Sequence, residues 1–348
     1  NTTASNNTAV GTSALAANTT GTSNVAVGAN ALDANTTGDD NVAVGFESLS
    51  ANTEGDDNTA VGHDSLKDNT TGATNVAVGS FALESNITAS SNTAVGYNSL
   101  KRNTTGTENV AVGANTLDAN TTGDDNTAIG NQALGANTEG EDNVAVGSNS
   151  LDANTTGSDN TALGTSALGG NTTANNNTAV GNRALLLNTT GAQNTSLGSL
   201  AGDVITTGSN NTSLGYQADP SSATADNEVT LGNSSVGALR CQVGLTILSD
   251  RRDKTNIVDL PTGLDFINLL KPRKFEWKTR EGVKTKDGTV RAGFIAQELQ
   301  EAQKGSEYLN LVYESNPEKL EATYGNLIPV LVKAVQELSE KVTALEIG

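Results

Sequence analysis

"NVAVGANALDANTTGDD", residues 24–40, is one unit of a repeat that fills the first two thirds of this 348-residue chain. Its opening, N-[TV]-A-V-G, returns every 17 residues without a slip. The glycine that closes this opening stands at Gly11, Gly28, Gly45, Gly62, Gly79, Gly96, Gly113, Gly130, Gly147, Gly164, Gly181, Gly198, Gly215 and Gly232. A fixed period of this length is typical of a solenoid in which each repeat forms one coil.

The residues within one repeat favour strands over helices. Each apolar run has only four or five β-favouring residues, with Gly before and Asn-Thr-Thr-Gly after it as turn signals. Seventeen residues with two turns leave room for two short strands and for no helix of useful length. We therefore predict a mainly β fold, a parallel β-solenoid over 1–232, with an amide ladder formed by one Asn per coil.

A single solenoid of this composition has few large apolar side chains to bury. The conformational entropy lost when 17 residues become ordered costs more free energy than the burial of two or three such side chains contributes. We expect neighbouring chains to supply the rest, with Leu15, Leu32 and their equivalents facing the shared axis of a homotrimer.

Charge divides the chain into two parts. Residues 1–248 carry 23 acidic and 5 basic side chains, whereas 249–348 carry 16 and 15. Such an acidic first part repels nucleic acid and anionic membranes, so neither is expected as a partner. The sequence has no apolar run of 18 residues that would insert into a membrane. It has no Met and begins at Asn1, so we expect a fragment or a processed form, and its single Cys241 excludes an intrachain disulfide.

Some residues of the repeats suggest small sites. "GDDN" at 38–41 and 123–126 and "GEDN" at 140–143 place paired acids at turns where Ca²⁺ could bind, although the spacing matches no known calcium loop. The simpler interpretation is that these acids are solvated and protect an edge from aggregation. We predict no metal and no cofactor. His63, the only His, is interpreted as a surface substitution.

The last hundred residues, 249–348, follow a connector over 233–248 and predict a small α+β domain. We expect a short amphipathic helix that Pro272 ends, then a strand carrying the core candidates Phe275 and Trp277. A hairpin turn is predicted at Asp287-Gly288, and Gly293 is predicted to open a second helix.

A final helix is predicted at about 326–347. Spacings of three and four alternate along one face, as expected for the a and d positions of a coiled coil. This candidate trimerisation seam is Ile328, Leu331, Val335, Leu338, Val342 and Leu345. It lasts under three heptads and is too short to be stable alone. It can act as a clamp on an assembly that is held elsewhere.

"LTILSDRRDKTNI", residues 245–257, joins the two parts of the chain, and two interpretations of it are open. It could be a charged linker, or Ser249 could be a nucleophile with Lys254 as its base. The domain contains no His, so a His-based triad is excluded there. A Lys can act as base where burial or cations such as Arg251 and Arg252 disfavour its charged form. Asp253 would act against this by pairing with Lys254.

The repeats resemble the head repeats of trimeric autotransporter adhesins, whose units read N-x-V-A-I-G. The sequence "NTAIG" at 126–130 is nearly a verbatim match, and the likeness covers 1–232. It implies a left-handed parallel β-roll with three chains side by side.

The last hundred residues carry "LSDRRDKTNI", "LKPRKFEWK", "GFIAQEL" and "YGNLIPVLVKAVQELSEKV" in that order. Together they look like the C-terminal intramolecular chaperone domain of endosialidases and phage tail fibres. The resemblance implies a domain that trimerises, drives folding of the preceding fibre and then cleaves itself off. It makes Ser249 the nucleophile, Lys254 the base and Leu248–Ser249 the scissile bond.

The leading hypothesis is a structural, receptor-binding homotrimeric fibre in the virion of a phage or phage-like particle. Its partners would be its own copies, a host glycan or surface protein, and other tail proteins bound through a missing N-terminal region. Cleavage would occur once per chain, with no external substrate.

Three alternatives are weighed against this hypothesis. The chaperone domain could be retained without cleavage. A bacterial trimeric surface adhesin is expected to carry a C-terminal membrane β-barrel anchor, and the residues after Leu345 do not lead us to expect one. A polysaccharide-degrading spike would need paired carboxylates and aromatic platforms in a cleft, and the repeats contain almost no aromatic residues.

Overall fold

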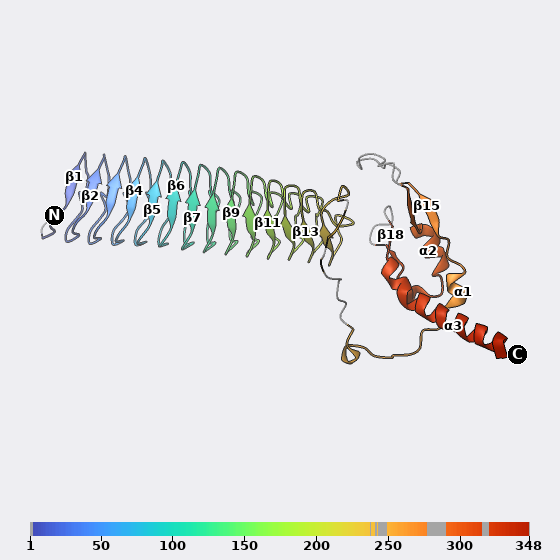
Figure 1. Cartoon of the computed structure of the whole chain (residues 1–348). Helices are drawn as coiled ribbons and strands as arrows, with labels where there is room; N and C mark the ends of the chain where they lie inside the picture. Colours follow the sequence, from blue (N-terminus) through green and yellow to red (C-terminus); the bar gives the residue numbers. More distant parts are fainter. Residues whose placement is uncertain are drawn as a thin grey trace. The chain divides into compact units, whose positions relative to one another are not determined.

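The computed structural model describes residues 3–236, 238–240, 242, 249–276, 290–314 and 320–347. The chain forms two compact units, Asn1–Asn233 (unit 1) and Ser234–Gly348 (unit 2) (Figure 1). Unit 1 is a parallel β-solenoid with 17-residue coils, and unit 2 is a small α+β unit that ends in a long helix. The predicted fold class is confirmed in these features.

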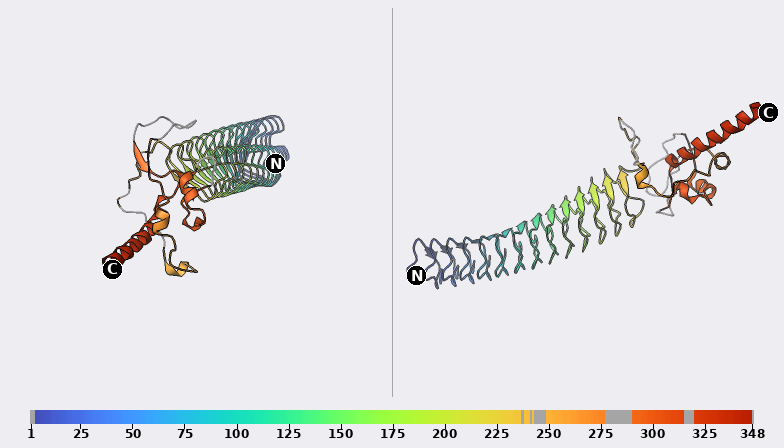
Figure 2. Two further views of the ribbon diagram at one scale, coloured as in Figure 1. Left: turned by 90° about the vertical axis from the view of Figure 1, so that its right-hand side faces the viewer. Right: turned by 90° about the horizontal axis from the view of Figure 1, so that it is seen from below.

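The described part of unit 1 contains one three-residue strand per coil. The strands are β1 Thr8–Val10, β2 Val25–Val27, β3 Val42–Val44, β4 Thr59–Val61, β5 Val76–Val78, β6 Thr93–Val95, β7 Val110–Val112, β8 Thr127–Ile129, β9 Val144–Val146, β10 Thr161–Leu163, β11 Thr178–Val180, β12 Thr195–Leu197, β13 Thr212–Leu214 and β14 Val229–Leu231. Each pairs in parallel with the next, 17 residues on, along one side of the coil stack (Figure 2).

The expected second strand in each coil is wrong. Turns occupy the rest of the coil, and their backbone groups bond mainly to the neighbouring coil. The amide of Leu32, for example, donates to the carbonyl of Ser48 at 3.0 Å. Leu32 itself has φ of 53°, a left-handed conformation that an extended strand does not contain.

The interior of each coil is filled by side chains of the same chain. Ala26, in the middle of β2, and Leu32, in the turn, are both fully buried, and so are their equivalents in the coils between the two ends of the stack. The expectation that Leu15 and Leu32 face an axis between chains is therefore wrong. The turn folds back over the strand and directs the leucine into the coil, so the outward positions are those of Val25 and Val27.

The repeating glycine sets the register between coils. Gly113 has φ of +138°, which L side chains rarely adopt, and a Cβ there would lie 2.6 Å from the carbonyl oxygen of Gly130. Both the backbone conformation and the close approach to the next coil therefore exclude a side chain.

Two asparagine ladders run inside the stack, where one was predicted. In the first, Nδ2 of Asn35 donates to Oδ1 of Asn18 at 2.9 Å, and this contact recurs as far as Asn188. In the second, the backbone N–H of Asn41 donates to the side-chain Oδ1 of Asn24 at 2.9 Å. These bonds satisfy buried polar groups without water.

The acidic turns are engaged with the backbone of neighbouring coils. Oδ1 of Asp39 accepts from the amide of Thr22 at 2.5 Å, and Asp124 does the same with Thr107. Across the described residues, no group of three or more His, Cys, Asp or Glu is placed to hold a metal ion.

Unit 2 is assembled from short elements around a small core. They are η1 Arg251–Asp253, α1 Leu264–Ile267, β15 Arg273–Phe275, β16 Arg291–Gly293, α2 Ala296–Ala302, η2 Glu307–Leu309, β17 Val312–Tyr313, β18 Glu321–Ala322, η3 Tyr324–Asn326 and α3 Leu327–Ile347. β15 pairs antiparallel with β16, and β17 with β18. The core is formed by Phe266, Leu299, Leu309, Leu311, Val312, Leu327 and Val330.

The prediction that Gly293 opens a helix is wrong. Gly293 is the last residue of strand β16, and helix α2 begins three residues later. A Cβ at Gly293 would lie 2.8 Å from Oη of Tyr324 and 3.2 Å from the ring of Phe275. The glycine therefore makes room for these two rings. Trp277, Asp287-Gly288, Cys241 and Leu248 lie outside the described residues. No helix in the described ranges has the length and apolarity needed to cross a membrane.

Candidate functional site

Ser249 and Lys254 are in direct contact. Nζ of Lys254 donates a hydrogen bond to Oγ of Ser249. The intervening turn η1 brings them together, because Oδ1 of Asp250 accepts from the amide of Arg252 at 2.8 Å and begins the turn. The amide of Lys254 then bonds to the carbonyl of Arg251 at 3.2 Å. Two residues five apart in sequence thus meet on one side of the turn.

Charges around this pair are arranged differently from the sequence expectation. Nη2 of Arg252 lies 2.6 Å from Oδ2 of Asp250. Hydrogen bonds from Arg252 hold the pKa of the Asp250 carboxyl below its usual range. Arg252 is therefore engaged with an acid and not with Lys254. Among the described residues, no ion pair joins Asp253 to Lys254.

Both members of the pair are exposed in the single chain. A Ser hydroxyl becomes a good nucleophile only when a base removes its proton, and a Lys acts as that base only when its charged form is disfavoured. The single chain does not bury Lys254, so a working dyad would need cover from another surface.

Helix α3 has two apolar faces. Leu327, Val330 and Ala334 are buried in unit 2. The six residues of the predicted seam point away from that core and are between 47 % and 83 % exposed, Leu331 and Val342 the least and Leu345 the most. Such a row of exposed apolar side chains is unusual for a monomer and marks a surface suited to association.

Glu337 ties α3 to the start of α1. Its Oε2 accepts from the amide of Leu264 at 2.7 Å, which satisfies one of the free N–H groups at that helix end. A side chain at Gly263 would collide with this carboxylate. The exposed seam is therefore held on a fixed support.

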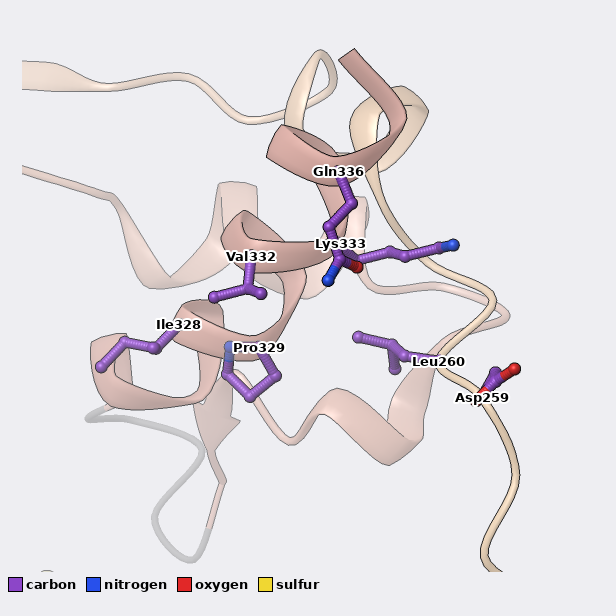
Figure 3. A pocket seen from close by; sticks show the side chains of 7 residues that line it. All are labelled: Asp259, Leu260, Ile328, Pro329, Val332, Lys333 and Gln336. Carbon is purple, nitrogen blue, oxygen red and sulfur yellow. The ribbon is translucent and has the colours of Figure 1, made fainter. Parts of the chain in front are cut away.

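A hollow of about 570 Å³ lies beside the first turns of α3 (Figure 3). Its lining residues are Asp259, Leu260, Ile328, Pro329, Val332, Lys333 and Gln336. Ile328 of the seam forms part of its wall, which combines four apolar residues with three polar or charged ones. The hollow suits an apolar side chain better than a reacting substrate.

The outer face of the unit 1 sheet is a second apolar surface. It consists of the first and third residues of each strand, and the third is Val, Ile or Leu in every strand. Several of these third residues are clearly exposed, including Val10, Ile129 and Leu197. The face runs across all the described strands, far beyond an isolated apolar residue.

Residues 249–307 match the model of the peptidase S74 family, described as chaperone of endosialidase. The chain carries an endosialidase-type chaperone domain that follows the β-solenoid in the sequence. The match begins at Ser249, the first residue of the candidate dyad, and α3 lies beyond its end. No curated protein and no solved structure matched the chain in the same comparisons.

Two features of the chaperone domain and the solenoid were not predicted from the sequence. The contact of Glu337 with Leu264 joins residues 73 apart and has no local signal. The outer sheet face did have a local signal. In V-A-V the small Ala alternates with large residues, which indicates that the Ala side faces the narrow interior of the coil.

Proposed function

We propose that this chain is a homotrimeric fibre of a phage or phage-like particle, which its C-terminal domain folds and then releases by cutting between Leu248 and Ser249. The observation that carries the proposal is the endosialidase-type chaperone domain directly behind a uniform β-solenoid. The fibre would attach the particle to a receptor on the host surface.

A uniform solenoid needs a device that sets the register between chains. Neighbouring coils present nearly the same residues, so three chains displaced by one coil would lose little contact energy locally. The exposed seam of α3 supplies such a device, because its a and d positions fix one alignment of three helices. The hollow next to Ile328 would receive a side chain from another copy.

The outer face of the sheet is the surface that we assign to contacts between the three solenoids. It offers one Val, Ile or Leu per coil, together with the Val or Thr two residues earlier. Burying this face would stabilise the trimer by roughly 25 cal/mol for each Å² of apolar surface removed from water. The leucines, which were expected to do this, already fill the coils.

The cleavage would proceed in two steps. Oγ of Ser249 attacks the carbonyl carbon of Leu248 while Lys254 takes the hydroxyl proton and passes it to the departing amide nitrogen. The peptide bond is thereby exchanged for an ester, which water hydrolyses to a carboxylate at Leu248 and a free hydroxyl at Ser249. The carbonyl belongs to the same chain, so proximity lowers the barrier. Trimerisation would supply the missing cover for Lys254 and couple cleavage to correct assembly.

The test compares the parent chain with Ser249→Ala, Lys254→Met and the control Ser339→Ala, an exposed serine on α3. On denaturing gels we expect two fragments from the parent and the control, and an intact chain from the other two variants. Mass spectrometry should place the new N-terminus at Ser249. Sedimentation should give trimers for all four proteins.

The outcomes separate the parts of the proposal. An uncut parent that is trimeric would remove the protease step and leave a retained chaperone domain. A folded monomeric parent would refute the fibre itself. Residues 1–248 expressed alone should aggregate or form mixed species, and uniform soluble trimers from them would refute the chaperone role.

A further inference from the structure

Four rings line up on consecutive coils of unit 1, and we call Phe46, His63, Phe81 and Tyr97 the aromatic stripe. Phe46 stacks on His63 with centroids 5.3 Å apart, His63 meets Phe81 edge-on at 5.3 Å, and Phe81 meets Tyr97 edge-on at 5.9 Å. Residues 1–233 contain one further Phe, Trp or Tyr, Tyr216, and no further His. The aromatic residues of the fibre are thus concentrated in one place.

Charged side chains of the same coils flank the stripe. Nζ of Lys67 lies 2.6 Å from Oε2 of Glu47 and 3.8 Å from Oδ1 of Asp64. Nζ of Lys101 lies 3.3 Å from Oε2 of Glu84 and 4.9 Å from the centre of the Phe81 ring. Carboxylate acceptors and ammonium donors therefore stand next to the rings, and their charges largely balance.

Two details show that these coils are built differently from the rest. Phe81 has φ of 62°, at a position two residues after the repeating glycine where most coils have Asn, Ser, Gln or another polar residue. The left-handed backbone itself recurs at this position in other coils, so what sets this coil apart is the aromatic side chain. Asp64 is 7 % exposed, and its Oδ1 has no hydrogen-bond partner within the described residues. This oxygen lies within ion-pair distance of Lys67, and Oδ2 of Asp64 lies 3.3 Å from Nδ1 of His63, so the carboxylate is held beside the stripe.

We propose that the aromatic stripe is a binding site for a neutral glycan, a chain of hexopyranose units that lies along the stripe. The C–H groups on one face of a pyranose ring form an apolar surface that packs against an aromatic ring. Its hydroxyls donate to carboxylates and accept from ammonium groups, as Glu47, Glu84, Lys67 and Lys101 would require. This inference rests on the proposed receptor-binding function and assigns it a place and a ligand class.

The surrounding charge favours a neutral glycan over an anionic one. Unit 1 is strongly acidic, so a polyanion would be repelled over most of its length. A purely stabilising role for the stripe is less favoured, because the other coils stack through the same backbone and Asn contacts without a row of neighbouring aromatic residues.

The test is affinity electrophoresis of the full chain in native gels containing dextran, galactomannan, laminarin or yeast mannan. The variant Phe46→Ala/Phe81→Asn/Tyr97→Ala places residues in the stripe that other coils already have at these positions, as in Ala29, Asn98 and Ala114. Tyr216→Ala is the matched control, since Tyr216 occupies the same position on a distant coil and is 57 % exposed. We expect at least one polysaccharide to retard the parent and the control, with binding at least tenfold weaker for the stripe variant.

Retardation by none of the four polysaccharides, or equal retardation of the stripe variant, would overturn the inference. So would loss of trimers in the stripe variant by sedimentation, because the rings would then belong to a contact between copies. A stripe variant that is trimeric, cleaved and unable to bind supports it. The fibre proposal fails separately, through a monomeric parent, whatever the gels show.

Discussion

Replacement of Asn103 by Ala tests the first asparagine ladder at its middle. Asn103 is fully buried, and its Nδ2 donates to Oδ1 of Asn86 at 3.1 Å and to the carbonyl of Gly106 at 2.8 Å. Its Oδ1 accepts from Nδ2 of Asn120 at 2.9 Å. After the change, the Gly106 carbonyl keeps a bond from Asn92, and Nδ2 of Asn120 keeps a bond to the Gly123 carbonyl.

Only Oδ1 of Asn86 would lose its sole partner. A buried acceptor left in this state costs about 1–3 kcal/mol, and the two weakened contacts add to it. We therefore expect the free energy of local opening to fall by about 2–4 kcal/mol in the coils around the change. The chain itself contains a precedent, because Ile205 replaces the next Asn of the ladder and leaves Oδ1 of Asn188 without a partner within the described residues.

The measurement is native-state hydrogen exchange by mass spectrometry on the full chain, since a repeat array need not unfold in one step. Asn131→Ala is the control, because Asn131 is exposed and its side chain makes one bond, from Nδ2 to the carbonyl of Ala114 at 3.1 Å. The control should change local opening by less than about 0.5 kcal/mol. If both variants exchange alike between residues 86 and 137, the ladder does not hold the coils together.

Three further predictions concern other parts of the chain. Gly113→Ala should destabilise its coil by at least about 1–3 kcal/mol through backbone strain and a clash with Gly130, whereas Gly135→Ala, where the nearest atom is 3.4 Å away, should not; equal exchange protection in both would contradict this. Burial raises the pKa of Asp118, so its charged form opposes folding at neutral pH and the folded state gains stability as pH falls through the raised pKa. Asp118→Asn should therefore raise the thermal midpoint at pH 7, and its advantage should shrink in acid; a constant difference would show that charge is not the cause. Leu338→Lys should convert trimers to smaller species in sedimentation, while Glu340→Lys, off the seam, should not, and intact Leu338→Lys trimers would exclude the seam from assembly.

The sequence predicted much of the candidate site because its signals are local. The residues alone left Ser249 and Lys254 open between a charged linker and a nucleophile with its base, and the resemblance to the endosialidase chaperone domain favoured the pair. Their contact depends on the turn η1. Asp250 begins this turn by accepting a hydrogen bond from the amide of Arg252, which is only two residues away in the sequence. The pairing of Arg252 with Asp250 was not predicted, because several acidic residues lie near Arg252 in the sequence. The geometry of the turn determines which of them its guanidinium contacts.

Distant contacts within unit 2 carried no such signal. Tyr324 donates from its Oη to the carbonyl of Phe294 and accepts from the amide of the same residue, both at 3.0 Å. This contact explains why residue 293 is Gly and why α2 begins later than expected. Residues 30 apart in the chain meet here, which residue spacing does not reveal.

By itself, the sequence determined the period, the solenoid and the place of every repeating glycine. The left-handed φ and the close approach to the next coil both require glycine at one position of the coil. This glycine recurs every 17 residues and is therefore visible in the sequence. The tertiary structure alone decided that the leucines face inward. Leu32 turns into its coil and Val27 out of it, because a turn's direction depends on how the whole coil closes.

The aromatic stripe makes the same distinction at a single residue. Phe46, His63 and Tyr97 each follow the repeating glycine directly, whereas Phe81 stands one position later and so falls outside the period. The left-handed backbone at Phe81 nevertheless brings its ring between those of His63 and Tyr97. A repeat fixes where a residue stands in the coil, and the fold of the coil fixes what its side chain meets.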